Sequence, residues 1–155
     1  MKAEFVETFI DAITDVFSTM IGLDISPEKM IAKDNHFALG EVSGIIAMTS
    51  NQIRGSFSIS LQASVVFECT ERLFGEKSEQ LDSETADLVG ELTNMVAGVA
   101  KATLETKGYD FGMATPNMLL GESHILNHQT ESRSVVVIPF TCDVGMVYLE
   151  IGLDD

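Results

Sequence analysis

The chain has 155 residues, of which 45% are hydrophobic and 21% are charged. This length and composition are typical of one globular domain with a packed core, so we treat residues 1–155 as a single domain. Nine basic residues stand against 24 acidic ones, a net charge of −15, which argues against binding nucleic acid or anionic lipid. No apolar run approaches the roughly 20 residues of a membrane-spanning helix, and the acidic start is unlike a signal peptide. We therefore expect a cytosolic protein.

The first third of the chain predicts one helix followed by strands. Apolar residues recur at helical spacing over residues 3–21, and Gly22 is a natural stop. The members of this apolar face are Phe5, Phe9, Ala12, Ile13, Val16, Phe17 and Met20. Ser26-Pro27 indicates a turn. Strands are predicted over 41–49 and 55–61, with a weaker strand before Gly40.

The segment GSFSISL (55–61) alternates apolar and hydroxyl residues, which is typical of a strand with one covered face. A short amphipathic helix over 63–74 follows and is closed by Gly75. Residues 28–33 and the acidic C-terminal end are interpreted as solvated surface.

The second half predicts a long helix over 83–107 and then strands. Asp82 or Ser83 is expected to cap the helix, and Gly108 to end it. The expected strands are residues 117–125, 132–140 and 145–152. Pro139 indicates an edge or irregular position within its strand.

The two halves resemble each other, because each has a helix, then strands, then a hairpin whose last strand opens with glycine: Gly55 or Gly145. This pattern hints at a duplicated α-β-β-β unit with 63–74 as the connector. Helices and strands segregated in this way predict an α+β fold, with helices packed on a mostly antiparallel sheet.

The long helix carries one narrow polar stripe, whereas its other faces are apolar or small. At 100° per residue the stripe spans a sector of about 100°. Its members are Glu84, Asp87, Glu91, Asn94, Gly98, Lys101 and Glu105. Glu91 and Asn94 are neighbours at i and i+3. Taken alone, the stripe has two interpretations. It could be a face exposed to water, with Gly98 serving close packing against a neighbour, or Glu91 and Asn94 could enter the cleft of another protein.

The run from Asp82 to Lys101, with GELTNMVAGVAK at its centre, resembles the central helix of the CheX/CheC/FliY phosphatases of bacterial chemotaxis. The segment ATPNMLLG (114–121) is similar to that family's approach to its C-terminal strands. The first helix offers Glu4 and Glu7, but neither is followed by Asn at the fourth position of an E-x-x-N motif. A single motif and no extra module make the chain resemble CheX more than CheC or FliY.

This resemblance implies a CheC-like fold and hydrolysis of the aspartyl phosphate on a CheY-like response regulator. Asn94 would position the attacking water, and Glu91 would pair with the regulator's active-site Lys. Glu84, Asp87, Gly98 and Lys101 would belong to the docking surface. The resemblance also implies a homodimer. No cofactor of its own is implied, with Mg²⁺ held by the regulator.

Two other classes of function remain open. A related interaction module of the flagellar switch would bind a regulator through the same stripe without removing its phosphate. A metal-dependent enzyme would need ligands such as His124 and His128, but residues four apart in an extended segment lie too far apart for one ion. His36 is isolated, and all three histidines are interpreted as surface or locally bonded. Cys69 and Cys142 lack any clustering and are expected to be packed thiols.

Overall fold

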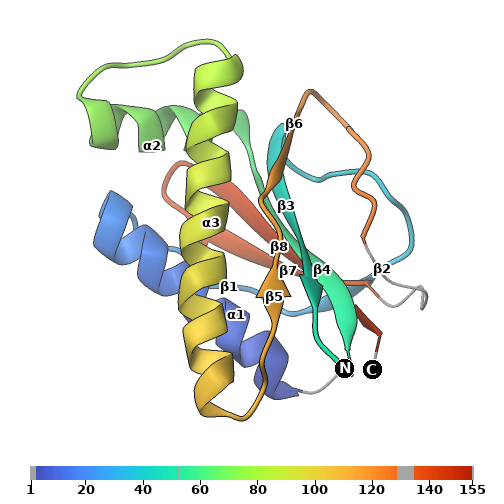
Figure 1. The fold of residues 1–155 in the computed structure, drawn as a ribbon. Coiled ribbons are helices and arrows are strands. Elements are labelled where there is room, and N and C mark those ends of the chain that lie inside the picture. Colours follow the sequence, from blue (N-terminus) through green and yellow to red (C-terminus); the bar gives the residue numbers. More distant parts are fainter. Residues whose placement is uncertain (1–2, 52, 129–134, 155) are drawn as a thin grey trace.

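The computed structural model describes residues 3–51, 53–128 and 135–154. Helices cover one face of a single sheet, and α3 lies across the front of that sheet in Figure 1. The predicted α+β class is confirmed. No helix in the described part of the chain is long and apolar enough to span a membrane.

The helices lie close to where the sequence predicts them. They are α1 (Ala3–Val16), a π-helical turn η1 (Phe17–Ile21), α2 (Ala63–Phe74) and α3 (Ser83–Thr106). Gly22 and Gly75 adopt φ of 72° and 74° at the ends of η1 and α2. Glycine enters this left-handed region without the penalty that other residues incur, so both helices end where expected.

The strands form one eight-stranded sheet. They are β1 (Ser26–Pro27), β2 (Ile31–Lys33), β3 (Val42–Thr49), β4 (Arg54–Leu61), β5 (Gly112–Met113), β6 (Asn117–Leu120), β7 (Val135–Cys142) and β8 (Gly145–Asp154). The order is β1-β7-β8-β4-β3-β5, with β2 also pairing β7 and β6 also pairing β3. Each of these pairs is antiparallel.

The strand order supports the duplicated unit. The last strands of the two halves, β4 and β8, pair with each other at the centre of the sheet. Each half also lends its two short strands to the other half: β1 and β2 pair with β7, whereas β5 and β6 pair with β3. The strands of the two halves therefore share one sheet.

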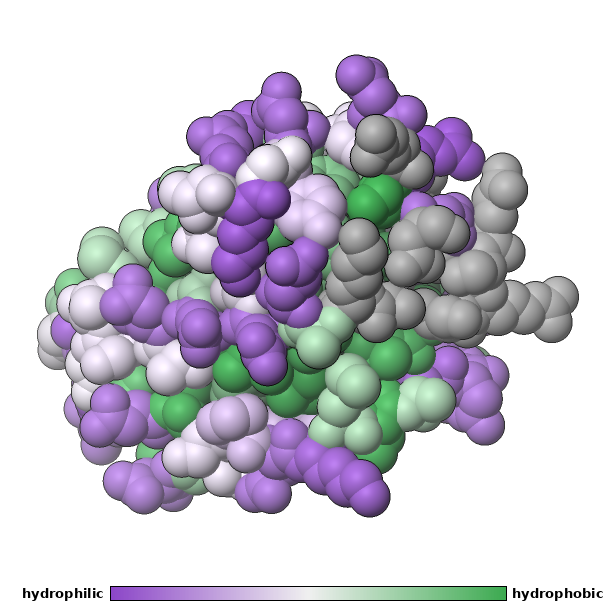
Figure 2. All heavy atoms as spheres, turned by 90° about the horizontal axis from the view of Figure 1, so that it is seen from below, coloured by the Kyte–Doolittle hydropathy of each residue, from purple (hydrophilic) through white to green (hydrophobic). Residues whose placement is uncertain are grey.

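The face of the sheet beneath the helices is apolar. Phe57, Ile59 and Leu61 of β4 are fully buried, as are Leu149 and Ile151 of β8, and all belong to the main core cluster with the apolar faces of the helices. Seen from the end where both termini lie, hydrophilic side chains surround this core and apolar atoms appear between them (Figure 2).

The opposite face of the sheet is also covered, contrary to the expectation of one covered face. Ser56, Ser58 and Ser60 are fully buried. Ser60 Oγ accepts a hydrogen bond from Gly40 N at 2.9 Å and contacts Ser43 Oγ at 2.8 Å. Gly40, just before β3, and His128, after β6, contact the hydroxyls of Ser60 and Ser56. The alternation of apolar and hydroxyl residues therefore corresponds to a buried polar layer on this face.

A buried ion pair lies in the same layer. Lys33 Nζ donates to Glu150 Oε2 at 2.6 Å, and these side chains are 5% and 0% exposed. His128 Nε2 lies 3.1 Å from Glu150 Oε1, and its Nδ1 lies 2.8 Å from Ser56 Oγ. The interpretation of residues 28–33 as solvated surface is therefore wrong at Lys33. His128, with a side chain only 4% exposed, is locally bonded rather than a surface group.

Two local predictions are also corrected. Ser26-Pro27 is not a turn but strand β1, because it pairs with Phe140 and Thr141 of β7. The strand predicted over 117–125 ends at Leu120, and Gly121 then takes φ of 113°, which turns the chain. Residues 132–134, the first part of the predicted strand 132–140, lie outside the described residues.

Pro139 lies in β7 between the stretches that pair with β1 and with β2. Its carbonyl accepts a hydrogen bond from Glu28 N at 2.7 Å. This is an irregular point of the sheet, as predicted, and the gap between two short strands accommodates a residue without an N–H.

Candidate functional site

The start of α3 is fixed by its own sequence. Asp82 is the N-cap: its side chain accepts hydrogen bonds from the backbone N–H groups of Glu84 and Thr85, both at 3.1 Å. Thr85 Oγ1 accepts in return from Asp82 N at 2.8 Å, which completes a capping box. This reciprocal cap sets the first turn, and therefore which later residues share a face.

Small and buried residues then determine which face of α3 meets the sheet. Thr93 is fully buried, and its hydroxyl donates to Val89 O at 2.6 Å. A Cβ placed on Gly90 would lie 2.7 Å from the Met118 sulfur of β6, so this glycine allows a close approach. With Gly90 and Thr93 facing inward, the positions beside them, Glu91 and Asn94, point outward.

Glu91 and Asn94 are both exposed. Neither side chain forms a hydrogen bond or ion pair with another described residue. Residues three apart on a helix have Cβ atoms about 5–6 Å apart, so one ligand can meet both groups. The structure therefore brings a free carboxylate and a free carboxamide side by side on a rigid helix.

Gly98 lies one turn beyond Asn94 and is exposed. A Cβ built on it would meet no atom within 4 Å, in contrast to Gly90. Close packing, the alternative raised by the sequence, therefore does not explain Gly98. An interior helical glycine costs about 1 kcal/mol relative to alanine, and what this one provides is open space beside Asn94.

The rest of the predicted docking stripe is also on the surface. Glu84, Asp87 and Glu105 are exposed, whereas Lys101 is half-buried and lines a shallow polar hollow with Asp110 and the chain around Ser50. Within the described part of the chain, these four charged side chains have no hydrogen-bond or ion-pair partner.

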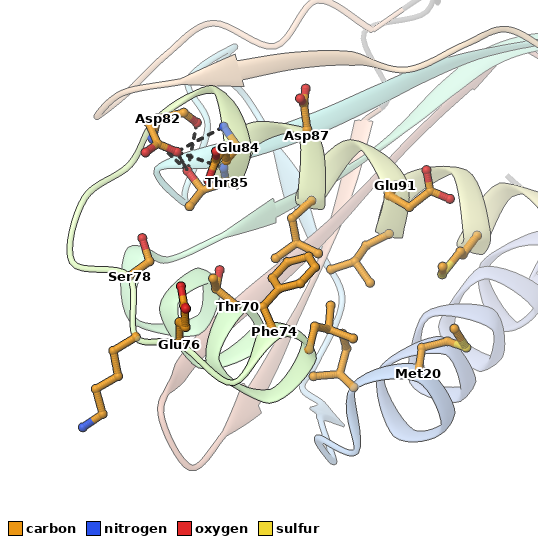
Figure 3. A pocket seen from close by; sticks show the side chains of 16 residues that line it. Met20, Thr70, Phe74, Glu76, Ser78, Asp82, Glu84, Thr85, Asp87 and Glu91 are labelled. Carbon is orange, nitrogen blue, oxygen red and sulfur yellow. Dashed lines mark hydrogen bonds between the residues drawn. The ribbon is translucent and has the colours of Figure 1, made fainter.

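An apolar groove beside the stripe was not predicted from the sequence. It has a volume of about 730 Å³ and lies between η1, α2 and α3. Figure 3 shows Phe74 of α2 and Met20 of η1 extending into it, with Glu91 at its edge. Glu91 thus belongs both to the stripe and to the groove, whereas Asn94 lies outside the groove.

Met20 shows why the groove was missed. Its spacing places it on the apolar face of the first helix, yet it is 49% exposed. The last turn of that helix is π-helical, and the wider turn shifts each following side chain relative to the α-helical face. A periodicity argument assumes 3.6 residues per turn and cannot detect this change.

Local hydrogen bonds hold His124 and His128 in place, whereas His36 is exposed. His124 bonds Gly121 O and Ser43 Oγ, both at 2.7 Å, and His128 is engaged by Ser56 and Glu150. Among the described residues, no group of three or more His, Cys, Asp or Glu side chains could hold a metal ion. Cys69 and Cys142 are free thiols. Burial raises the pKa of Cys69 to about 12, as expected for a packed thiol.

Comparisons with known proteins agree with this geometry. The profile of the family described as "Chemotaxis phosphatase CheX" matches residues 42–141. A search of curated protein sequences gave no match. A CheC-like superfamily protein from Shewanella sp. PV-4 has a crystal structure similar to this chain at 39% identity, with a TM-score of 0.92 and both chains covered completely.

Two further crystal structures are similar. The chemotaxis protein CheX from Vibrio vulnificus is 39% identical over 98% of this chain and 100% of its own, with a TM-score of 0.90. CheX from Borrelia burgdorferi, in a complex with CheY, BeF₃ and Mg²⁺, matches at 24% identity and a TM-score of 0.81 over 99% and 100%. The chain described here therefore belongs to the CheX family of chemotaxis phosphatases.

Proposed function

We propose that this protein removes the phosphoryl group from the aspartyl phosphate of a CheY-like response regulator. In this reaction Asn94 positions the attacking water, and Glu91 pairs with the regulator's active-site Lys. The observation that carries the proposal is the exposed Glu91–Asn94 pair on α3, with neither side chain bonded to another described residue. Membership of the CheX family supports it.

Asn94 suits the role of water positioning because a carboxamide both accepts and donates hydrogen bonds. Phosphoryl transfer to water requires the nucleophile in line with the leaving oxygen, and the enzyme contributes mainly position and charge stabilisation. The carboxamide oxygen can accept from the water while the NH₂ group donates to a phosphoryl oxygen. The rigid helix fixes the position of this residue on the docking surface, and contact with the regulator would then orient its side chain.

Glu91 suits the role of docking. Its carboxylate is exposed before binding, so it avoids the cost of a buried unpaired charge. A salt bridge to the regulator's Lys would form only in the complex and would fix the register in which Asn94 meets the phosphate. Glu84, Asp87 and Lys101 extend the same surface, and Gly98 leaves clearance for the regulator beside Asn94.

The regulator is expected to carry the Mg²⁺ that neutralises phosphoryl charge, so this chain need supply no metal. The Borrelia relative was crystallised with CheY, BeF₃ and Mg²⁺. A cytoplasmic location follows from the proposal, because that is where CheY-like regulators act.

We also propose that the protein forms a homodimer. Phe37, Leu39 and Ile125 are 54%, 45% and 55% exposed. Phe37 and Ile125 are paired across an isolated β-bridge, on the segments that cover the second face of the sheet. These three side chains form an apolar surface on the side of the sheet away from the helices, so a second copy bound there would leave the stripe free.

The test is the decay of a regulator phosphorylated with acetyl phosphate in Mg²⁺, with and without this protein. We expect faster loss of the phosphoryl group with the protein present. Asn94→Ala should lower kcat by at least about 100-fold, the scale seen when a positioned transition-state group is removed, with little change in affinity for the BeF₃-loaded regulator. Asn127→Ala changes an equally exposed Asn elsewhere and should match the wild type.

Each contrary result has a defined meaning. Wild-type activity in Asn94→Ala would remove Asn94 from the mechanism. Binding of the regulator without faster phosphoryl loss by the wild type would identify an interaction module of the flagellar-switch kind instead.

A further inference from the structure

The groove between η1, α2 and α3 has an apolar floor that the proposed chemistry does not use. Met20 and Phe74 are 49% and 68% exposed there, and Leu73 beside them is 38% exposed. Leu88 and Leu92 of α3 form the deeper part of the groove and are buried. A monomer gains nothing from leaving large apolar side chains in water, and apolar hollows with a polar rim are characteristic of binding sites.

The shape of the groove is held by specific contacts. Arg72 of α2 donates a hydrogen bond to the backbone oxygen of Gly22, directly after η1. The same guanidinium lies 3.5 Å from Glu68. This contact ties the end of the π-helical turn to α2, so the two walls are preorganised. A π-helical turn is often found at functional sites, and here it places Met20 in the groove.

The rim of the groove is strongly acidic. Glu76, Glu84, Asp87 and Glu91 line it, against a single basic residue, Lys77. Figure 3 shows Asp87 and Glu91 on α3, with their carboxylates directed away from Phe74 and Met20. Charge complementarity therefore favours an occupant with an apolar side chain next to basic ones. A second copy docked groove to groove fits poorly, because the two acidic rims would face each other.

The groove is continuous with the proposed catalytic surface. Glu91 lines the groove, and Met95, four residues farther along α3, lines it as well. One helical turn is only about 5.4 Å long. A specific interface covers about 800 Å² of each partner, far more than two side chains, so a regulator docked on Glu91 and Asn94 extends over this hollow.

We propose that the groove is a second anchoring site for the same response regulator, and that it receives an apolar side chain flanked by basic residues next to the regulator's active-site Lys. This inference rests on the proposed function. Met20 and Phe74 would then contribute to the affinity for the regulator although they do not touch the reacting atoms. Glu84 and Glu76 on the rim attract the basic side chains.

The test separates binding from chemistry. The double variant Met20→Ser/Phe74→Ser should raise KM for the phosphorylated regulator, and Kd for the BeF₃- and Mg²⁺-loaded regulator, by about tenfold or more, as for loss of a buried anchor. Its kcat should stay within about twofold of the wild type. The matched control is Met30→Ser: Met30 is 48% exposed but outside the groove, and its change should leave KM and Kd unaltered. A urea unfolding curve verifies that each variant folds.

The charge of the occupant is tested separately. Glu84→Gln should weaken binding of the loaded regulator by about threefold and reduce the salt dependence of Kd. Glu122→Gln removes an exposed acid that does not line the groove and should have neither effect. Equal behaviour of these two variants would overturn the basic character assigned to the occupant.

The outcomes distinguish this inference from the proposed function. If the wild type accelerates dephosphorylation but the double variant has unchanged KM and Kd, the groove inference is wrong and the proposed function stands. If the wild type does not accelerate dephosphorylation, the proposed function fails. The Kd values of the wild type and the double variant for the loaded regulator then still show whether the groove binds it. A double variant that alters sedimentation of the protein alone, without altering Kd, would assign the groove to a second copy and overturn the inference.

Discussion

Thr93 of α3 occupies the space that a side chain on Gly44 of β3 would need. A Cβ built on Gly44 would lie 2.2 Å from Thr93 Oγ1 and 2.9 Å from Thr93 Cβ. The missing side chain lets α3 sit directly on the sheet, with Thr93 fully buried and the adjacent Asn94 exposed. The orientation of the proposed catalytic residue is thus set by a glycine 50 positions away in the sequence.

We therefore predict that Gly44→Ala destabilises the protein. Overpacking of a tight contact costs about 1–3 kcal/mol, and the shift of α3 should also lower the rate of regulator dephosphorylation. Urea unfolding gives the free energy, and the decay assay gives the rate. Gly112→Ala is the matched control, because a Cβ there meets its nearest atom at 3.4 Å. An unchanged unfolding free energy for Gly44→Ala would show that α3 does not depend on this contact.

A small side chain at Gly98 should stabilise the protein, whereas one at Gly44 should destabilise it. Because a Cβ at this exposed helical position meets nothing within 4 Å, Gly98→Ala should raise the free energy of unfolding by about 0.5–1 kcal/mol. Gly98→Leu keeps most of this helix gain, but its side chain should obstruct docking and raise KM for the phosphorylated regulator. If Gly98→Leu dephosphorylates the regulator as well as Gly98→Ala, the clearance assigned to Gly98 is not needed.

Removing the charge of Glu91 should weaken docking more than folding. Glu91 is exposed and has no hydrogen-bond or ion-pair partner in the described part of the chain. Glu91→Gln should therefore leave the unfolding free energy within about 0.5 kcal/mol of the wild type, while kcat/KM falls by at least tenfold. Glu105→Gln, at the far end of the stripe, is the control. A normal kcat/KM in Glu91→Gln would exclude the salt bridge to the regulator.

The buried pair of Lys33 and Glu150 should contribute to stability only while it is complete. Lys33→Met leaves a fully buried carboxylate whose remaining hydrogen-bond partner among the described residues is His128, and removing one member of a buried pair costs about 3–5 kcal/mol. Adding Glu150→Gln removes the unpaired charge but keeps an acceptor for His128, so the double variant should be more stable than Lys33→Met alone. Urea unfolding of the wild type, Lys33→Met, Glu150→Gln and the double variant completes a double-mutant cycle, which gives the interaction energy of the pair. Additive losses would show that Lys33 and Glu150 do not interact.

Much of the fold could be predicted because its signals are local. Gly22, Gly75 and the Asp82 cap mark the ends of helices within a few residues of sequence, and the period of the apolar residues separates helix from strand. The polar stripe was predictable for the same reason, since a regular helix fixes which of its residues share a face. Its assignment to regulator docking came from resemblance to the CheX family.

Two of the errors occurred where distant segments meet, and a third where the geometry of a helix changes locally. The alternating serines of β4 suggested a solvent-facing row, but they are buried, and Gly40 and His128 contact two of them. The sequence around Lys33 indicated a surface charge, because its partner Glu150 lies 117 positions later in the chain. Met20 read as core because the sequence carries no mark of the π-helical turn.

The sequence by itself determined the helix and strand pattern, the single E-x-x-N motif and the polar stripe on α3, because capping, glycine and periodicity act between near neighbours. Only the tertiary structure decided that Gly44 and Gly90 are packed while Gly98 is open, that the second face of the sheet is a buried polar layer, and that an acidic, apolar-floored groove adjoins Glu91. Each of these depends on which remote residue fills, or leaves empty, the space beside a side chain, and that space exists only after the chain has folded.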